Sequence, residues 1–427
     1  MVTIAVVSLI IMLIIGVPVC FAIGLSGLLA LVIGGGEGAF MAVQQAVRGM
    51  NSFSLMAGPL FILAGEILGG AKLSQRILDF CRALIAWLRG GMGMVSVAAN
   101  MIFAGISGSG AATMTAVGTL TVPELKKTGY SNSFISALIA GSGALGPIIP
   151  PSTNMIVVAS LTGYSIGKIF IGGLIPGIII GLCLMGMCFL YARRHGIDGG
   201  EGKFEIKTLG RAFKDAFFAL LTPIIIIGGV VTGIFTATES GIVACIYGLF
   251  CGFVVYRTLK IRDLADIFKR AASSSAMLMM LMGISSIYSY IIAKENLSQT
   301  IEDFMLSVSE NPTVVVLIII GIMLIIGCFM ETLAATAVIL PIVYPIVLDL
   351  GFDPLLFCVL FSIATVIGAL TPPVGLYLFV SMNIVGTAFK EAIRYTTPVM
   401  LIILAVMVLM LVYPPLVTAL PNMMIGT

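Results

Sequence analysis

The chain has 427 residues, of which 59% are hydrophobic and only 10% are charged, and its formal net charge is +3. That balance excludes an ordinary soluble domain, in which about 25% of residues are charged. Apolar runs at 2–15, 169–191 and 396–418 predict membrane-crossing helices, because about 20 helical residues cross a hydrocarbon core of about 30 Å. We therefore expect an all-α polytopic membrane protein. The first run lacks the basic segment and cleavage site of a signal peptide, so we expect it to be the first span.

Two clusters of basic residues separate the later spans and are expected to lie in cytoplasmic loops. The first contains Arg193, Arg194, Lys203, Lys207, Arg211 and Lys214, and the second contains Arg257, Lys260, Arg262, Lys269 and Arg270. The apolar segment between the clusters is long enough for two spans, so it returns the chain to the same side.

A polar octamer occurs twice, as Leu73–Phe80 (LSQRILDF) and as Leu297–Phe304 (LSQTIEDF), starting 224 residues apart. The surroundings of the two copies carry opposite charge: residues 72–90 contain four basic and one acidic residue, whereas residues 294–311 contain one basic and four acidic residues. The first copy is therefore expected at the cytoplasmic face and the second at the outer face. Related segments on opposite faces indicate an inverted-topology repeat.

The residues of the first octamer also predict its local structure. Leu73, Ile77 and Phe80 are spaced for one apolar face of a helix. We interpret this helix as one that lies flat at the membrane face and braces a moving hairpin against a static scaffold. Trp87, which follows it, is the expected anchor at the interface.

A second match supports the repeat and sets its limits. Gly146–Ser152 (GPIIPPS) and Gly368–Val374 (GALTPPV) start 222 residues apart, and each interrupts an apolar segment. Together the matches predict a first inverted repeat at 1–195, a basic cytoplasmic linker at 196–216 and a second inverted repeat at 217–427.

The predicted path has ten spans and two re-entrant hairpins. The hairpins are expected at about 92–123 and 312–347, each followed by a broken helix, at about 132–162 and 355–388. The first hairpin enters from the cytoplasmic face and the second from the outer face. Glycine and proline at the breaks free backbone carbonyls, which suit a hard cation such as sodium, while the positive N-termini of half-helices suit an anion.

Four motifs in a fixed order carry a resemblance to a known family. GISGSGAAT at 105–113, VPELKK at 122–127, GPIIPPS at 146–152 and LTPPVG at 370–375 resemble the large membrane subunit of tripartite ATP-independent periplasmic (TRAP) transporters, over nearly the whole chain. The resemblance implies sodium-driven uptake of an organic acid by an elevator-type movement. It also implies two partners, a small membrane subunit and a periplasmic substrate-binding protein. Sialic acid, C4-dicarboxylates and other carboxylates are all open as substrates, and sialic acid is the first we would name.

The breaks and the resemblance together predict two sodium sites. The first is expected to contain Ser107, Ser109, Gly110, Gly146 and Pro150, and the second Gly327, Thr332, Gly368 and Thr371. The substrate is expected between the hairpin tips, with candidate contacts from Ser109, Asn154, Glu331 and Pro372. We expect no cofactor beyond sodium as the coupling ion.

Three carboxylates lie in apolar runs, where such groups are candidates for function. For Glu331, a role at the ion site and a role in scaffolding the hairpin are both open, whereas for Glu66 and Glu239 we favour a structural or subunit-facing role. Alternative functions are a stand-alone sodium/carboxylate symporter or an ion channel that needs no binding protein. An enzyme is not expected, because the single histidine lies in a loop and the chain has no H-E-x-x-H motif.

Overall fold

The computed structural model describes residues 1–36, 38–197, 204–297, 299, 301, 302, 309, 311–372 and 375–425. Over these residues the regular structure is helical and contains no β-strand, which confirms the predicted all-α class. Many helices begin at a side-chain cap: Ser131 before α8, Ser152 before α9 and Asp353 before α17 each accept a hydrogen bond from a backbone N–H three residues on.

The helices of the first part of the chain are α1 (Val2–Ile14), α2 (Val19–Leu29), α3 (Ala39–Met50), α4 (Ala57–Gly70), α5 (Leu73–Ile85), α6 (Gly91–Ser107), α7 (Gly110–Lys127), α8 (Asn132–Gly143), α9 (Thr153–Thr162) and α10 (Ile166–His195). The later helices are α11 (Ile206–Val231), α12 (Ala237–Phe250), α13 (Ile261–Lys294), α15 (Pro312–Gly327), α16 (Thr332–Asp349), α17 (Pro354–Leu370), α18 (Leu376–Val385), α19 (Phe389–Val412) and α20 (Pro415–Ile425). Short π- or 3₁₀-helical turns join them at η1 (Ala30–Gly34), η2 (Ser54–Met56) and η3 (Cys251–Val255).

Six of the described helices are long and apolar enough to cross a membrane by themselves. They are α10, α11, α12 continued through η3, α13, α16 and α19, and the pair of α3 and α4, bent by 66°, makes a seventh candidate. The predicted span at 2–15 is shorter than expected, since α1 has 13 residues and reaches only about 20 Å at 1.5 Å per residue. The other predicted crossings, at 132–162 and 355–388, are each built from two short helices.

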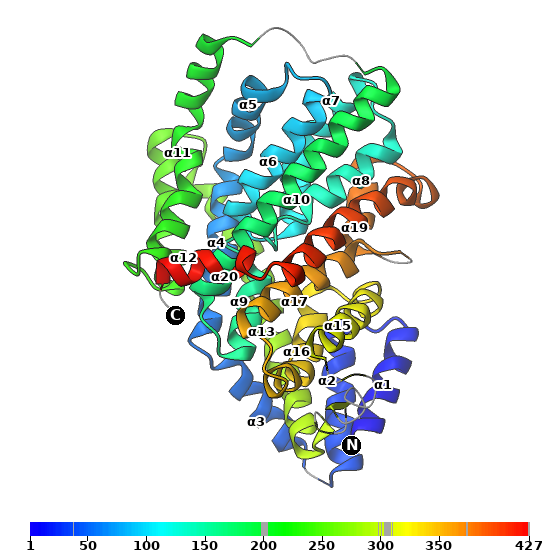
Figure 1. Ribbon diagram of the computed structural model, residues 1–427. Coiled ribbons are helices and arrows are strands. Elements are labelled where there is room, and N and C mark those ends of the chain that lie inside the picture. The colour runs from blue at the N-terminus through cyan, green and yellow to red at the C-terminus, as the bar shows by residue number, and fades with distance from the viewer. Residues whose placement is uncertain are drawn as a thin grey trace.

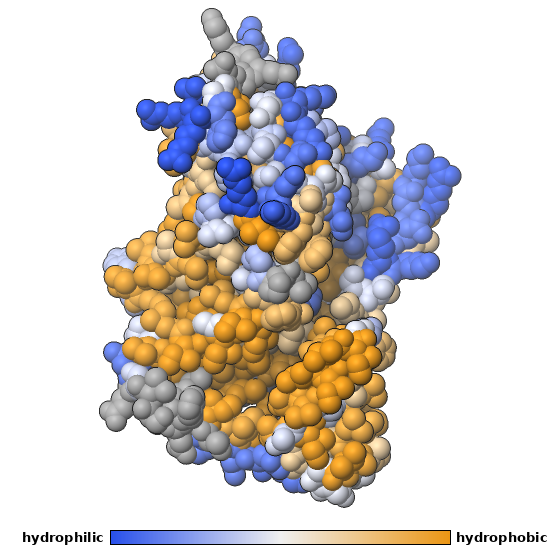
Figure 2. Space-filling model, turned by 90° about the vertical axis from the view of Figure 1, so that its right-hand side faces the viewer, coloured by the Kyte–Doolittle hydropathy of each residue, from blue (hydrophilic) through white to orange (hydrophobic). Residues whose placement is uncertain are grey.

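Charged segments gather at one end of the molecule. Figure 1 shows α5 and the first turns of α11 at this end and α1 to α3 at the other, and Figure 2 shows a polar cap at this end above a broad apolar surface. The two basic segments and the first octamer meet here: the Arg76 guanidinium lies 4.0 Å from the ring centroid of Tyr256, whose hydroxyl donates to the Asp215 carbonyl at 3.0 Å. The shared end agrees with the predicted placement of both basic clusters on one side.

The basic segments are more helical than expected. Arg262, Lys269 and Arg270, expected in a loop, lie in α13, where the Asp263 carboxylate accepts from the Lys260 backbone N–H at 2.9 Å and starts the helix. Similarly, α11 begins within the predicted linker 196–216, of which residues 198–203 lie outside the described part. Lysine and arginine are good helix formers, so a span can extend into a charged segment without a break.

The first octamer forms the predicted amphipathic helix, α5. Leu73 and Ile77 are fully buried, and the Phe80 ring lies 6.0 Å from the ring of Phe213 in α11. The helix packs between α6 and α11, and its Arg82 forms an ion pair with Glu124 of α7 at 3.1 Å. It therefore joins the first predicted hairpin to α11. Half of the second octamer, including Asp303 and Phe304, lies outside the described residues.

Helix breaks occur in the same order in both parts of the chain. α6 and α7 are separated at residues 108–109, and α15 and α16 at 328–331, near the middle of each predicted hairpin. α8 and α9 are separated at 144–152, and α17 and α18 at 371–375, of which 373 and 374 lie outside the described part. This order is what the predicted repeat requires, and the orientation of the halves in a membrane stays a prediction.

Candidate functional site

The tip between α6 and α7 lies directly against the break between α8 and α9. Gly108 ends α6 with a φ of +63°, a left-handed conformation that glycine adopts freely, and its carbonyl accepts from the Thr153 backbone N–H at 3.3 Å and from the Thr153 hydroxyl at 3.1 Å. A Cβ at Gly146 would lie 2.7 Å from the Ser109 carbonyl oxygen and 2.9 Å from the Gly110 nitrogen. The structure thus brings the predicted residues Ser109, Gly110 and Gly146 together.

Hydroxyl groups line the inside of this tip. The Ser107 and Thr113 hydroxyl oxygens are 2.6 Å apart, and the Thr113 hydroxyl also donates to the Ser109 carbonyl at 2.8 Å. Pro150, which was expected in the same site, has its carbonyl oxygen 3.5 Å from the Cβ position of Gly105, one turn before the tip. Its neighbour Pro151 contacts the tip, because its carbonyl oxygen would lie 2.5 Å from a Cβ at Gly108.

Of the second predicted sodium site, Gly327 and Gly368 are in direct contact. Gly327 and Gly368 pack against each other so closely that a Cβ on either would lie 2.6 Å from the other's Cα. Thr371 directly follows α17, and its hydroxyl donates back to the Ile367 carbonyl in the last turn of that helix at 2.8 Å. Thr332 is the first residue of α16, and its hydroxyl is 3.4 Å from that of Tyr377.

Asn154, a candidate substrate contact, ties three helices together. It is the second residue of α9 and is 1% exposed. Its amide nitrogen donates to the Thr365 hydroxyl of α17 at 3.1 Å, and its amide oxygen accepts from the Thr336 hydroxyl of α16 at 2.9 Å. In this conformation the amide holds the first broken helix to the second hairpin and to the second broken helix.

The Glu331 carboxylate caps the second hairpin. It precedes α16, and one of its oxygens accepts from the backbone N–H groups of Leu333 at 3.0 Å and Ala334 at 3.3 Å. A carboxylate at a helix N-terminus satisfies free N–H groups and complements the helix dipole. This contact belongs to the scaffolding interpretation of Glu331. Pro372, the remaining predicted substrate contact, is half-buried directly after Thr371.

The two other carboxylates in apolar runs make the structural contacts we favoured. Glu66 of α4 accepts from the Arg270 guanidinium of α13 at 2.8 Å. Glu239 forms a capping box with Thr236 at the start of α12, where its carboxylate accepts from the Thr236 backbone N–H at 2.8 Å. Neither contact involves a hairpin tip.

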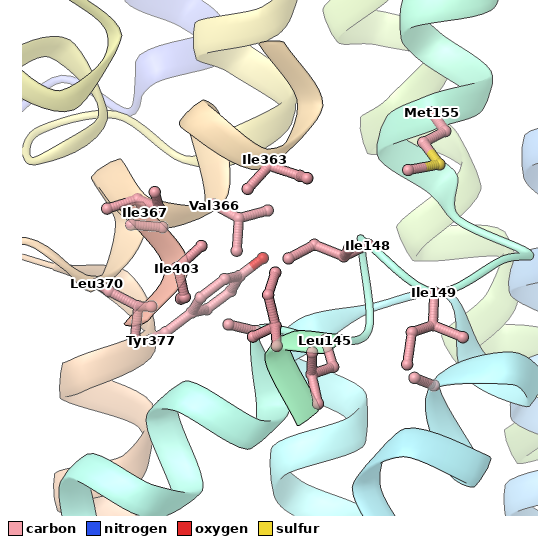
Figure 3. Packing of buried hydrophobic residues seen from close by; sticks show 14 of the residues in the cluster. Leu145, Ile148, Ile149, Met155, Ile363, Val366, Ile367, Leu370, Tyr377 and Ile403 are labelled. Carbon is pink, nitrogen blue, oxygen red and sulfur yellow. The ribbon is translucent and has the colours of Figure 1, made fainter. Parts of the chain in front are cut away.

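Sequence reasoning missed Tyr377, which lies between the two tips. Its ring packs on Gly110, since a Cβ there would lie 2.7 Å from Tyr377 Cζ, and its hydroxyl faces Thr332. Figure 3 shows the ring among buried aliphatic side chains. In the structure Tyr377 is the second residue of α18 just as Asn154 is the second residue of α9. The spacings of the two sequence matches, 222 and 224 residues, do not align these positions, so no signal in the sequence pointed to Tyr377.

Asn100 is a second residue that the sequence analysis passed over. It is fully buried in α6, and its amide nitrogen donates to the Ser142 hydroxyl, just before the first break, at 2.8 Å. Its amide oxygen is the single buried side-chain nitrogen or oxygen without a hydrogen-bond partner among the described residues. A buried carbonyl-type oxygen of this kind is a candidate ligand for a hard cation.

The chemistry of the site follows from these groups. The tips and breaks present hydroxyl, amide and carbonyl oxygens, and the segments 91–123, 132–167 and 311–389 contain no lysine or arginine. Within the described ranges, no group of three or more histidine, cysteine, aspartate or glutamate side chains could hold a metal ion. The arrangement suits a weakly bound alkali cation and an anionic ligand, which helix N-termini attract.

Comparison with known proteins places the chain among transporters. The family model described as "Tripartite ATP-independent periplasmic transporter, DctM component" matches residues 6–416. The chain is 37% identical over 397 residues to the isethionate TRAP transporter permease protein DctMQ of Oleidesulfovibrio alaskensis, covering 93% of this chain and 62% of that protein. It therefore spans less than two thirds of that relative.

Two further relatives match along nearly their full length. The sialic acid TRAP transporter large permease protein SiaM of Vibrio cholerae is 33% identical over 415 residues, which cover 96% of each chain. The C4-dicarboxylate TRAP transporter large permease protein DctM of Pseudomonas aeruginosa is 31% identical over 401 residues, which cover 94% of each chain.

Two solved structures share the fold at low sequence identity. The YdaH transporter of Alcanivorax borkumensis superposes with a TM-score of 0.66 at 14% identity, covering 86% of this chain and 87% of that one. MtrF of Neisseria gonorrhoeae superposes with a TM-score of 0.57, also at 14% identity, covering 87% of this chain and 83% of that one. At this identity the likeness concerns the fold alone.

Proposed function

We propose that this chain, which belongs to the DctM component family of tripartite ATP-independent periplasmic transporters, carries an organic acid across the membrane together with sodium ions. The protein is a multi-pass protein of the inner membrane. The observation that carries the proposal is the seating of the first hairpin tip on the first break, where Ser109 and Gly110 meet Gly146. Such a contact between irregular backbone segments concentrates carbonyl and hydroxyl oxygens around a small volume, as an ion site requires.

The proposed substrate class is a small organic anion. The relatives are named for isethionate, sialic acid and C4-dicarboxylates, each of which carries an acidic group. The hairpins and broken helices contain no basic side chain, so the charge of such a substrate has to be balanced by co-transported cations and by helix N-termini. We propose sodium for this role, and sialic acid as the first substrate to test.

The proposed mechanism uses the paired hairpins. In the predicted inverted repeat, one hairpin enters from each face, and the substrate lies between their tips. The proposed ligands of the first sodium site are oxygens of Ser107, Ser109, Gly110 and Gly146. For the second site we propose the backbone around Gly327 and Gly368, together with Thr332. The hairpins and broken helices would then move as one body against the remaining helices, as an elevator.

Two partner proteins are part of the proposal. A tripartite transporter has two components besides the large permease, and we propose that they are a small membrane subunit and a periplasmic substrate-binding protein. The binding protein would deliver the anion to the outer face, where the second hairpin is predicted to enter. Both components are expected as separate polypeptides or fused segments outside residues 1–427.

The experiment that tests this function is uptake of labelled organic acids into proteoliposomes that hold the chain and its small membrane subunit. Uptake is measured with and without an inward sodium gradient, and with and without the cognate binding protein. We expect uptake of one acid to require both. Flux that is indifferent to sodium would indicate a channel, and sodium-dependent flux without the binding protein would indicate a stand-alone symporter.

A further inference from the structure

We propose that Tyr377 is a positioning residue that couples the two hairpin tips, so that sodium bound at one tip changes the sodium affinity at the other. This inference rests on the proposed function, because it concerns the two sodium sites proposed there. Tyr377 is the second residue of α18 and only 5% of it is exposed. It is therefore a buried side chain that directly follows the second break.

The first contact of Tyr377 is with the first hairpin. Gly110 is the first residue of α7, and a Cβ at this position would lie 2.7 Å from Cζ, 2.8 Å from the hydroxyl oxygen and 3.0 Å from Cε1 of Tyr377. The tip of the ring thus occupies the space that any side chain at position 110 would need. Because Gly110 also borders Gly146, a shift of the ring is passed directly to the first proposed sodium site.

The second contact is with the second hairpin. Thr332 is the first residue of α16, and its hydroxyl lies 3.4 Å from that of Tyr377, which makes a long hydrogen bond. Hydrogen bonds in the resting state of a site are often long and shorten when the ligand arrives. Tyr377 therefore contacts the first residue of the second helix of each hairpin, α7 in the first and α16 in the second. These are the two helix N-termini that face the proposed substrate.

The ring cannot adjust to one tip without affecting the other. Figure 3 shows it among Leu145, Ile148, Val366 and Ile403, all of which are buried. Close-packed interiors transmit displacement because they contain little free volume. An ion that orders the first tip fixes the position of Gly110. Because the Tyr377 ring packs on Gly110, the ring is then fixed as well, and so is its hydroxyl, which faces Thr332. The second ion then binds a tip that is already ordered, and by thermodynamic linkage the effect is reciprocal.

The equivalent residue of the first broken helix makes different contacts. Asn154 hydrogen-bonds to Thr336, one turn into α16, and to Thr365 of α17. Tyr377 has the longer of the two side chains and reaches the ends of both hairpins. The coupling is thus assigned to one half of the molecule and not to both.

The test is a sodium titration of the purified full membrane complex, in which the rise in melting temperature reports sodium binding. Tyr377→Phe keeps the ring on Gly110 and removes the hydroxyl that faces Thr332. Tyr130→Phe is the matched control, because the buried Tyr130 hydroxyl donates to the Gly90 carbonyl at 3.0 Å, far along α6 from the tips. We expect sigmoidal curves for the wild type and the control. For Tyr377→Phe we expect a non-sigmoidal curve, and an apparent sodium affinity weakened by roughly 5-fold or more.

Each outcome decides a separate question. A sigmoidal wild-type curve that Tyr377→Phe leaves unchanged overturns the coupling and leaves the proposed function intact. A wild type whose melting temperature does not respond to sodium, while lithium and potassium are equally inert, contradicts the proposed sodium coupling itself. Loss of sigmoidal behaviour in Tyr130→Phe as well would show that any buried hydroxyl has this effect, which also overturns the specific role of Tyr377.

A second pair of variants tests the ring contact directly. Gly110→Ala places a methyl group against the Tyr377 ring, and we expect at least a 10-fold loss of sodium-dependent uptake for an effect of about 1.4 kcal/mol. Tyr377→Leu removes the ring atoms in the way, so Gly110→Ala should cost much less uptake in the Tyr377→Leu background than in the wild type. An equal cost of Gly110→Ala in both backgrounds would show that the methyl group acts elsewhere, and the contact would carry no coupling.

Discussion

The two hairpin tips are held against the broken helices by different kinds of contact. The first tip meets its broken helix through the Gly108 carbonyl, which accepts from the Thr153 hydroxyl, and through the close packing of Gly146 on the Ser109 carbonyl. The second hairpin meets its broken helix through backbone, where Gly327 packs on Gly368 and the Cys328 carbonyl accepts from the Gly375 N–H at 3.3 Å. It also meets it through the long hydrogen bond between the Thr332 and Tyr377 hydroxyls. Both tips thus meet a broken helix at closely packed glycines, but the broken helix binds a backbone carbonyl of the first tip and a threonine side chain of the second.

The largest expected effect comes from filling the glycine contacts. Gly146→Ala and Gly368→Ala each place a methyl group under 3 Å from backbone of the facing segment, which cannot move aside as a side chain can. Overpacking of this kind costs about 1–3 kcal/mol, and we expect uptake to fall at least 10-fold. Uptake by proteoliposomes with equal amounts of inserted protein measures the effect.

A matched control separates the contact from the substitution. Gly321→Ala lies in α15 of the second hairpin, and nothing is within 4 Å of its Cβ position. Its uptake should equal that of the wild type. If Gly368→Ala were as active as Gly321→Ala, the close glycine contact would have no part in transport, and the contrast between the halves would lose its meaning.

The second prediction concerns the residue that links the halves. Asn154→Ala removes a donor to Thr365 and an acceptor from Thr336, and leaving buried polar groups without partners costs about 1–3 kcal/mol. The cost should fall toward the lower figure, because both threonine hydroxyls also donate to carbonyls of their own helices. The melting temperature of the complex measures it. An unchanged melting temperature for Asn154→Ala would contradict a role for this amide in holding the helices together.

The third prediction concerns the N-terminal caps of α7 and α16, the second helix of each hairpin. Glu331 caps α16 with its side chain, whereas Ser109 precedes α7 without a side-chain cap. Glu331→Ala should lose about 0.5–2 kcal/mol, and Glu331→Asn, which also caps helices well, should recover most of it. Wild-type sodium activation in Glu331→Asn would support a scaffolding role, while a stable but sodium-insensitive Glu331→Asn would assign Glu331 to the ion site.

The smallest expected effect is at the edge of the first hairpin. Arg82 of α5 pairs with Glu124 of α7 at 3.1 Å, and both side chains are more than one third exposed. Exposed ion pairs are worth about 0.2–1 kcal/mol, and salt weakens them. Arg82→Gln and Glu124→Gln should therefore each lower the melting temperature slightly, and the double variant should be no worse than either. A large loss of uptake at unchanged stability would give the pair a role in hairpin movement.

Much of the architecture was predictable because membrane helices can be recognised in a sequence by their length and hydropathy. The breaks were also predictable, since glycine and proline in an apolar run disrupt a helix wherever it lies. The role of Tyr377 was not predictable, because an aromatic residue in an apolar helix cannot be distinguished by sequence from an ordinary core residue. The contacts of Gly327 with Gly368 and of Thr332 with Tyr377 were not predictable either, because they depend on how separate helices pack and not on a local pattern.

The amino-acid sequence by itself determined that this protein is helical, lies in a membrane and has two sets of breaks in one order. These properties are local, since each follows from hydropathy, charge or glycine and proline content over a few turns. Only the tertiary structure decided that Ser109 meets Gly146, that Asn154 ties α9 to α16 and α17, and that Tyr377 stands between the tips. Those contacts join residues far apart in the chain, and they depend on how whole helices pack against one another.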